Sequence, residues 1–406
     1  MMVGCYHCSA GLSATEASQT CMEHRMTQRR TGNILLVSNY PSDVGYAWWL
    51  MEHFWVLLAE HFSQKGQSAY LAYPSITKLP STIKESSIKT VELNVPGQTE
   101  SERQTAKSFI KQHNITDLYL TDRAWFSVDY ARLRAWGVKN IVVHDHTPGD
   151  RPAIGGLKGC VKALRHRLPL ACADAQLCVS DLMKKRSIHN GRIPSERCQV
   201  VQNGIPPVTP SEHTREALLS SLDIPADSTV CITTGRAHPY KRFDFIIDVA
   251  AELQRTLPNN KLVFLLIGNG PALEKLREKV AKAGLERNIR LPGFRSDAKE
   301  FLSAADFAMH AALGEGFSLS IVEYMSAALP VLVPDIPSVK QAIDHDLNGF
   351  VYSKDDVKQA ADYIRALYSS ESYRKKLGAN AKRKADARYT LDNCTREFKA
   401  ACQQVF

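Results

Sequence analysis

The sequence predicts an α/β protein built from two doubly wound parallel sheets that face each other across a cleft. Three observations lead to this prediction. Apolar strand candidates and helical segments alternate from residue 33 onward. The alternation stops at VQNGIPPVTPSEHTREA (201–217), where three prolines and an Asn-Gly pair indicate an interdomain linker. It then restarts and continues almost to the end of the chain.

The first half of the chain contains seven runs that are typical of buried strands. NILLVSN (33–39) is the first, a short apolar stretch that ends in polar turn residues. Segments of helical length lie between the runs, and GYAWWLMEHFWVLLAEHF (45–62) has a wide apolar face. The other expected strands cover 68–73, 89–95, 116–122, 139–146, 175–180 and 199–204, and the other expected helices cover 100–113, 127–136, 156–167 and 181–190.

The second half repeats this rhythm after the linker. Its helices end the chain in two consecutive stretches, 371–386 and 391–404, with no strand between them. Strands are expected at 229–235, 261–268, 289–293, 306–312, 329–334 and 349–352, and helices between them at 241–256, 271–283, 297–304, 317–328 and 354–369.

The composition and net charge of the chain indicate which class of protein it is and which classes of partner it can bind. The 406 residues are 44% apolar and 23% charged, as in an ordinary globular protein of two or three domains. No apolar run approaches the roughly 18 residues of a membrane span, and residues 1–30 lack the apolar region of a signal peptide, so we expect a cytoplasmic protein with reduced cysteines. The net charge of +9 fits nucleic acid, an anionic membrane surface or phosphate-bearing small molecules. Nucleic acid is not expected, because the chain lacks platforms of basic and aromatic residues.

The residues that directly follow strands carry the functional information, because ligands of such sheets bind outside the carboxyl ends of the strands. Gly235, Arg236 and Lys241 follow the strand at 229–235. Glycine lets the backbone approach a ligand closely, arginine offers a fork of donors to phosphate oxygens, and lysine adds a compact charge. Near a helix start these residues suit a diphosphate, although exposed cations at helix starts are also common.

A second strand end in this half carries a glycine pair. Gly268 and Gly270 precede Pro271 after the strand at 261–268. This pattern is at least as typical of a tight structural turn as of a ligand contact.

Two glutamates follow the strand at 306–312, in LGEGFSLSIVEYM. Glu315 lies between two glycines, directly before a predicted helix whose amino-terminal amides can hold an anion or a sugar hydroxyl. Glu323 lies two turns into that helix, among apolar residues where a carboxylate seldom stays without a partner. It can accept both hydroxyls of a vicinal diol such as a ribose; the alternative is a glutamate that complements the helix dipole.

The first half contributes two histidines at a strand end, in HDHTPGDRP (144–152). His144 and Asp145 are neighbours in a strand and point to opposite faces, so a metal site is not expected. Contact of His144 or His146 with a sugar or acceptor hydroxyl is the favoured interpretation. The loop before the helix at 45–62 contains a single glycine, Gly45, and a full G-x-G-x-x-G motif is absent, which argues against a dinucleotide-dependent dehydrogenase.

Taken together, these segments resemble the retaining glycosyltransferases of family 4, which have the two-domain GT-B fold. The resemblance covers about residues 33–404, and its most specific part is EGFSLSIVE (315–323), two glutamates separated by seven residues. Arg242 and Ala328 stand where the family often has glycine, and a slightly wider helix end is expected to accommodate Ala328. Supporting segments are GR (235–236), YKRFD (240–244), IGNGP (267–271), VSDLMKK (179–185) and VVQNGI (200–205).

The resemblance implies a nucleotide-sugar donor, a UDP- or GDP-sugar, with no cofactor and no metal required. Arg236 and Lys241 would grip the donor diphosphate, and Glu323 would hold the ribose hydroxyls. The implied catalytic residues are Arg236, Lys241, Glu315 and His144, and the implied donor-binding residues are Glu323, Gly235, Gly316, Phe317, Ser318 and Gly45, with His146, Gly268 and Gly270 as further candidates.

The resemblance also implies a domain plan and a reaction. Residues 31–205 would form an acceptor-side Rossmann-like domain, residues 206–388 a nucleotide-sugar-binding domain, and residues 389–406 a helix that packs back on the first domain. A hexosyl unit would pass with retention to a glycan or lipid-linked acceptor in surface polysaccharide, lipopolysaccharide or glycolipid synthesis. From its residues alone, the basic amphipathic segment 156–167 is interpreted either as a docking site for the anionic inner face of the cell membrane or as a solvated helix face. The alternatives are a nucleotide-sugar epimerase and an inactive GT-B binding module.

Residues 1–30 match nothing in this family. Cys5, Cys8, Cys21 and His24 have the spacing of a small zinc knuckle. Because few apolar residues accompany them, a disordered extension is the preferred prediction.

Overall fold

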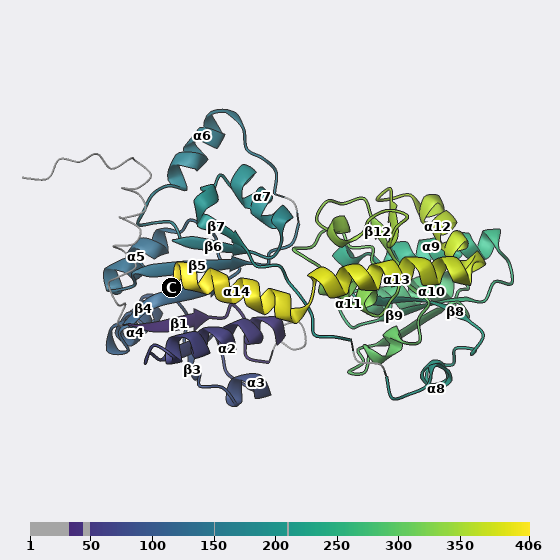
Figure 1. Ribbon diagram of the computed structural model, residues 1–406, viewed down its shortest axis with the longest axis horizontal. Coiled ribbons are helices and arrows are strands. Elements are labelled where there is room, and N and C mark those ends of the chain that lie inside the picture. The colour runs from purple at the N-terminus through teal and green to yellow at the C-terminus, as the bar shows by residue number, and fades with distance from the viewer. Residues whose placement is uncertain (1–31, 44–48, 150, 209–210) are drawn as a thin grey trace, which may run out of the picture.

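Two parallel sheets, one in each half of the chain, form the framework of the molecule (Figure 1). The computed structural model describes residues 32–43, 49–149, 151–208 and 211–406. The zinc-knuckle candidates Cys5, Cys8, Cys21 and His24, and the loop residue Gly45, lie outside the described residues.

The first sheet has seven strands in the order β3-β2-β1-β4-β5-β6-β7, and all neighbouring strands run parallel. Helix α2 and the last helix, α14 (Leu391–Val405), cover one face, and helices α4 and α5 cover the other. The strands are β1 (Asn33–Val37), β2 (Ala69–Tyr73), β3 (Lys89–Glu92), β4 (Ile115–Thr121), β5 (Asn140–Asp145), β6 (Ala175–Cys178) and β7 (Cys198–Val200), and the helices are α2 (Trp49–Ser63), α3 (Ser81–Lys84), α4 (Glu100–Gln112), α5 (Val128–Trp136), α6 (Gly156–Arg165) and α7 (Asp181–His189).

The second sheet has six parallel strands in the order β10-β9-β8-β11-β12-β13. Among its strands, β9 and β11 are continuous apolar runs, because helices cover both faces of the sheet. The strands are β8 (Thr229–Thr234), β9 (Leu262–Ile267), β10 (Ile289–Gly293), β11 (Phe307–Met309), β12 (Val331–Pro334) and β13 (Gly349–Tyr352), and the helices are α8 (Arg215–Ser220), α9 (Phe243–Thr256), α10 (Leu273–Lys282), α11 (Leu319–Ser326), α12 (Val357–Ser369), α13 (Glu371–Arg388) and α14 (Leu391–Val405).

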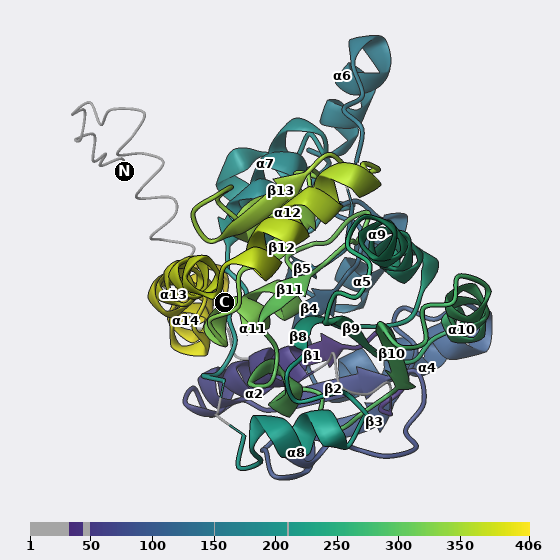
Figure 2. The ribbon, with the colours of Figure 1, turned by 90° about the vertical axis from the view of Figure 1, so that its right-hand side faces the viewer.

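The chain crosses between the two sheets twice, and the two crossings lie side by side. The backbone N–H of Ile205 donates to the carbonyl of Tyr389 at 2.9 Å, and the N–H of Leu391 donates to the carbonyl of Ile205 at 2.7 Å. A Cβ on Gly204 would lie 2.2 Å from the carbonyl oxygen of Thr390, so only glycine allows this close approach. Helix α13 packs on the second sheet, whereas α14 returns to the first (Figures 1 and 2).

Helix α14 completes the core of the first sheet. Its Phe398 is buried against Phe54 of α2, with ring centroids 4.5 Å apart. The side chain of Glu397 accepts a hydrogen bond from the backbone N–H of Gln202 at 2.8 Å. The predicted GT-B architecture, including the return of the last helix, is therefore confirmed.

Several element limits differ from the prediction. The helix expected at 241–256 begins at Phe243, because Arg242 adopts a left-handed conformation with φ of 55° and separates it from a 3₁₀ turn at Pro239–Lys241. The helix expected at 297–304 is only a 3₁₀ turn, Glu300–Leu302. Helix α8 begins inside the predicted linker 201–217 and was not predicted. The Thr214 side chain caps its start by accepting a hydrogen bond from the N–H of Ala217.

The carboxyl end of α11 corrects the interpretation of Ala328. The N–H of Ala328 donates to Met325 and the N–H of Leu329 donates to Tyr324, each at 3.0 Å, which is a Schellman motif. Ala328 has a φ of 59° in this motif. The helix end is therefore not widened; instead, alanine occupies a left-handed position that favours glycine.

Substitution of Ala328 by glycine is therefore expected to stabilise the protein. The strain of the left-handed alanine is removed, so the free energy of unfolding should rise by about 1 kcal/mol in urea denaturation. Ala327, at φ of −80°, is the matched control. Its change to glycine should lower the free energy of unfolding by about 1 kcal/mol, and a stabilising A327G would contradict this explanation.

Candidate functional site

The loops after β8 and β11 bring Lys241 and Glu315 together. These strands are neighbours in the second sheet, so the residues that follow them meet at the same sheet edge. The Nζ atom of Lys241 lies 2.5 Å from Oε1 of Glu315, and Nε2 of His310 lies 2.9 Å from the same oxygen. The Lys241 and Glu315 side chains are only 12% and 13% exposed. The predicted pair of strand-end residues is thus one compact cluster, and His310 is a member that sequence reasoning missed.

The charges of this cluster follow from burial and from its partners. Burial would raise the pKa of Glu315, but Lys241 and the His310 hydrogen bond outweigh burial and lower the pKa to about 2. Burial lowers the pKa of His310. At neutral pH a neutral His310 therefore donates its Nε2–H to a charged Glu315 carboxylate. Such a carboxylate can accept hydrogen bonds from sugar hydroxyls but cannot supply a proton.

Protonation of Glu315 gives an expected pH effect on stability. The native pKa of about 2 lies below the ordinary value of 4.5, so this group stabilises the fold above pH 4.5 and loses that contribution as the pH falls toward 2. We expect the difference in unfolding free energy between wild type and E315Q to shrink by about 3 kcal/mol over this window. Urea denaturation of both proteins at several pH values measures it. A difference that stays constant from pH 5 to about pH 2 would contradict the assigned charge state.

Helix α11 begins beside this cluster and positions three predicted donor-binding residues. Phe317 is buried against Tyr389, with ring centroids 5.1 Å apart, and Ser318 places its Oγ 3.5 Å from Nε2 of His310. Gly316 lies against the first domain, because a Cβ there would be 2.6 Å from the carbonyl oxygen of His146. The amino-terminal amides of α11 thus lie where the two domains touch.

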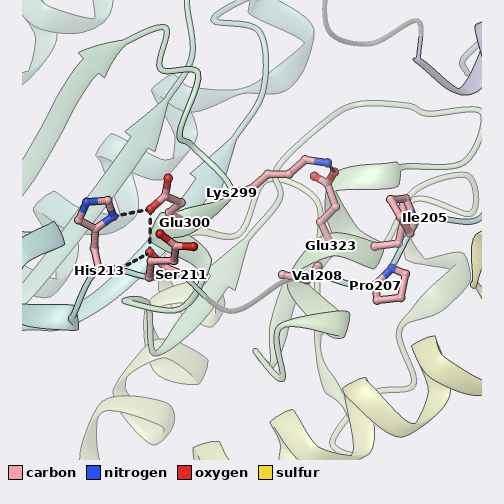
Figure 3. Close-up of a pocket in the computed structure, with 10 residues that line it drawn as sticks. Ile205, Pro207, Val208, Ser211, His213, Lys299, Glu300 and Glu323 are labelled. Carbon is pink, nitrogen blue, oxygen red and sulfur yellow. Dashed lines mark hydrogen bonds and ion pairs between the residues drawn. The ribbon is translucent and has the colours of Figure 1, made fainter. Parts of the chain in front are cut away.

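Glu323 lies on the same helix but at a different cavity, shown in Figure 3. Its Oε1 is 3.0 Å from Nζ of Lys299, a partner that sequence reasoning did not identify. The ammonium group of Lys299 also lies 5.8 Å from the ring centroid of Trp49 in the first domain. The cavity has a volume of about 450 Å³ and is lined by Ile205, Pro206, Pro207, Val208, Ser211, Glu212, His213, Lys299, Glu300 and Glu323.

Among the other predicted residues of the second-domain loops, Arg236 remains a candidate ligand contact, whereas Gly268 and Gly270 have structural roles. Arg236 is exposed directly after Gly235, and Gly235 has a φ of 149°. A Cβ on Gly268 would lie 1.7 Å from the carbonyl oxygen of Gly235, and one on Gly270 would lie 2.4 Å from that of Ala237. Close packing of the two loops therefore accounts for glycine at 268 and 270 without a ligand.

The two histidines of the first domain have different surroundings. His144 is fully buried on β5, where its Nδ1 lies 2.5 Å from the Tyr119 hydroxyl and its ring packs between Phe54 and Phe398. His146 is half-buried as a residue, in the loop that touches Gly316, but its ring atom Nε2 is buried. Burial lowers the pKa of His146 to about 4, so this imidazole is neutral at neutral pH. Of the two, His146 lies on the loop nearest the second-domain cluster.

A buried ion pair within the first domain fixes the conformation of this histidine loop, which touches the second domain. The guanidinium of Arg186 lies 3.1 Å from Asp145 and donates to the carbonyls of Thr147, at 3.2 Å, and Gly149. The N–H of Gly149 in turn faces the carbonyl of Glu315 at 3.4 Å. Sequence reasoning missed Arg186, although its place three residues after Met183 on the buried face of α7 was a readable signal.

The described part of the chain contains neither a metal-binding group of side chains nor a membrane-spanning helix. No group of three or more His, Cys, Asp or Glu side chains there is arranged to hold a metal ion. None of the described helices combines the length and the apolar character that crossing a bilayer requires.

Comparison with known proteins adds one family and several relatives. Residues 214–384 match the family model described as Glycosyl transferases group 1. A D-inositol 3-phosphate glycosyltransferase of Jonesia denitrificans is 25% identical over 223 residues, which cover 52% of this chain and 52% of that protein. A UDP-Gal:alpha-D-GlcNAc-diphosphoundecaprenol alpha-1,3-galactosyltransferase of Escherichia coli is 24% identical over 202 residues, 48% of this chain and 51% of that protein. The chain thus spans about half the length of these curated relatives.

A solved structure is similar over nearly the whole chain. The crystal structure of HepE from Anabaena in complex with UDP has a TM-score of 0.70 and 19% sequence identity, and the match covers 91% of this chain and 99% of that one. At this identity the likeness establishes the shared two-domain fold.

Proposed function

We infer that this chain, which has the GT-B fold and matches the group 1 glycosyltransferase family model over residues 214–384, transfers a sugar from a nucleotide-diphosphate donor to an acceptor hydroxyl. The observation that carries this proposal is the buried Lys241–Glu315–His310 cluster at the sheet edge that touches the first domain. The exposed Arg236 directly follows Gly235, and a Cβ on Gly235 would lie 3.9 Å from Cε of Lys241. Two cations next to a charged carboxylate suit a ligand that carries both phosphates and hydroxyls.

The donor's parts would be divided among the described residues. Arg236 and Lys241 would bind the diphosphate, together with the amino-terminal amides of α11 at Gly316, Phe317 and Ser318. Glu315 would accept hydrogen bonds from hydroxyls of the transferred sugar. Glu323 would hold the ribose, with Lys299 displaced from its present ion pair.

The first domain would supply the acceptor side of the site. We assign the contact with the donor sugar to His146 and not to His144, because His144 is fully buried and bonded to Tyr119. The proposed domain limits follow the same division, with residues 31–205 on the acceptor side, residues 206–388 on the donor side and residues 389–406 returning to the first domain.

The reaction we propose is front-face transfer of a hexosyl unit with retention of configuration. The acceptor oxygen attacks the anomeric carbon from the side of the departing diphosphate, the bond from that carbon to the phosphate oxygen breaks, and the leaving phosphate oxygen takes the hydroxyl proton. Arg236 and Lys241 stabilise the charge that develops on the diphosphate, the role that a metal ion plays in other transferases. No side chain acts as a nucleophile, and Glu315, with a pKa of about 2, does not act as an acid.

The donor and acceptor classes are proposed from the relatives. HepE of Anabaena was solved with UDP, so a UDP-sugar is the first donor to test, followed by a GDP-sugar. The E. coli relative acts on a diphosphoundecaprenol-linked sugar by its name, so a lipid-linked glycan acceptor is proposed here too. Such an acceptor is used in surface polysaccharide or lipopolysaccharide synthesis, and the protein would work in the cytoplasm at the inner face of the membrane.

Thermal unfolding with a panel of UDP-, GDP- and ADP-sugars tests the donor site without knowledge of the acceptor. We expect one nucleotide to raise the melting temperature by several degrees at about 100 times its Kd, without added metal. The change R236A should abolish this rise, whereas R277A, at an exposed arginine on α10, should retain it.

Two results of the nucleotide-sugar panel would contradict the proposed donor site. If no nucleotide sugar changes the melting temperature, the donor site is wrong. A rise that survives in R236A would place the nucleotide elsewhere. Once the donor is known, the anomeric configuration of the product, measured by NMR, tests retention.

A further inference from the structure

Helix α6 carries an apolar face that points away from the protein. Leu157 and Leu164 are 82% and 70% exposed, and Val161 lies between them at helical spacing, also exposed. The turn after the helix adds Leu168 and Leu170 to this face. Figure 2 shows α6 standing out from the rest of the molecule. We call these five residues, Leu157, Val161, Leu164, Leu168 and Leu170, the α6 surface.

The opposite face of α6 is fixed to the first domain. A Cβ on Gly159 would lie 2.4 Å from the carbonyl oxygen of Ile154, so this part of the helix packs closely on the chain that precedes it. Lys162 donates from Nζ to the carbonyl of Asn190 at 2.8 Å, and His166 is buried. The polar contacts therefore face inward and the apolar side chains face solvent, which is the reverse of an ordinary surface helix.

The charge around the α6 surface has one sign. Between residues 151 and 173 the chain contains no aspartate or glutamate. Arg165 lies over the ring of Phe126 at 4.8 Å, and Lys158 and Arg167 are exposed beside the leucines. The basic residues of this stretch are Arg151, Lys158, Lys162, Arg165 and Arg167.

We propose that the α6 surface docks this protein on an anionic lipid bilayer. Leucine and valine side chains on one side of a helix enter the boundary between headgroups and acyl chains, while lysine and arginine meet anionic headgroups. The surface is a single protruding helix with a uniformly basic surround. Such a surface matches the delocalised negative charge of a membrane better than the fixed charge pattern of a protein partner.

The position of α6 connects docking to the site. Helix α6 begins at Gly156, within ten residues of the loop that carries His146 and Gly149. This loop touches the second domain at Glu315 and Gly316. Docking would therefore hold the acceptor side of the site near the bilayer. This link between docking and the acceptor rests on the proposed function. The docking itself is independent of catalysis and is tested without any sugar.

Flotation of the purified full chain with vesicles tests the proposal. We expect it to float with vesicles of phosphatidylcholine and phosphatidylglycerol, to float weakly with phosphatidylcholine alone, and to dissociate as salt rises. The pair L157Q/L164Q should weaken partitioning by about tenfold or more. The pair K158Q/R167Q should weaken binding to anionic vesicles by about 20-fold and leave binding to neutral vesicles unchanged.

Matched controls separate the α6 surface from general hydrophobicity. Val128 and Leu347 are also exposed apolar residues, outside this surface, and V128Q and L347Q should float as the wild type does. Each variant is checked by its melting temperature and by its shift with the donor found in the panel, so loss of docking is distinguished from loss of the donor site or of the fold.

Three results would overturn the proposal. The first is a wild-type protein that does not float with anionic vesicles. The second is an L157Q/L164Q variant that floats as well as the wild type. The third is sedimentation that shows a wild-type dimer converted to a monomer by L157Q/L164Q, which would assign the α6 surface to a second copy of this chain.

Discussion

Replacement of Lys241 by alanine is expected to lower kcat/KM for sugar transfer by about 100- to 1,000-fold. The ammonium group is 2.5 Å from Glu315, at the point where the proposed mechanism needs positive charge on the leaving diphosphate. Its removal also leaves a buried carboxylate that, among the described residues, keeps the hydrogen bond from His310. We therefore also expect the free energy of unfolding to fall by about 3 kcal/mol. Initial rates with the identified donor and urea denaturation measure the two effects.

The double variant K241A/E315Q separates stability from catalysis. It removes both charges of the pair, so most of the lost stability should return, because a neutral glutamine needs no cation. The activity should not return, because the diphosphate still lacks its lysine. If K241A keeps wild-type activity, or if the double variant recovers it, Lys241 does not stabilise the leaving group.

Replacement of Arg186 by methionine is expected to lower the free energy of unfolding by about 3 kcal/mol. Arg186 and Asp145 are 5% and 4% exposed, so the variant leaves a buried carboxylate without its nearest cation. The carbonyls of Thr147 and Gly149 lose their donor as well. Arg151, 3.7 Å from Asp145 but half exposed, replaces the lost charge only in part.

A second ion pair of helix α7 provides the control for Arg186. Arg388 pairs with Asp181 at 2.8 Å, but these side chains are 56% and 63% exposed, so R388M should cost less than about 1 kcal/mol. Arg186 is a positioning residue in our proposal, and R186M should lower kcat more than it lowers nucleotide affinity, because only the loop of His146 is displaced. An R186M protein as stable as R388M would contradict the assigned role of the buried pair.

The two sheets could be predicted because their signals are local. A strand such as Leu262–Ile267 is apolar at every position, and this pattern is typical of a parallel strand whose two faces are both covered. The strand ends then place Arg236, Lys241 and Glu315 at one edge by topology alone. Element limits were less accurate, because the start of α9 depends on the backbone conformation of one residue, Arg242.

The partners of the site residues could not be predicted, because they depend on tertiary approach. Lys299 reaches Glu323 from a separate turn 24 positions earlier in the chain. His310 looked like part of an apolar strand end, and its contact with Glu315 depends on how the loop folds back.

The difference between His144 and His146 has a similar origin. Both lie at the carboxyl end of the same strand, and His144 is covered because Phe398, about 250 residues later, packs on it. The local sequence pattern therefore could not show which of the two histidines faces the site.

The return of α14 has a consequence for the order in which the protein is made. A ribosome releases the amino-terminal half first. The core of that half nevertheless includes Cys394, Phe398, Ala401 and Cys402 from the last helix. The half that is synthesised first must therefore wait for the last residues before its core closes, whereas the second sheet and α13 are complete by residue 388. During synthesis, the donor-side half can finish folding while the acceptor side still exposes the apolar groove that α14 will fill.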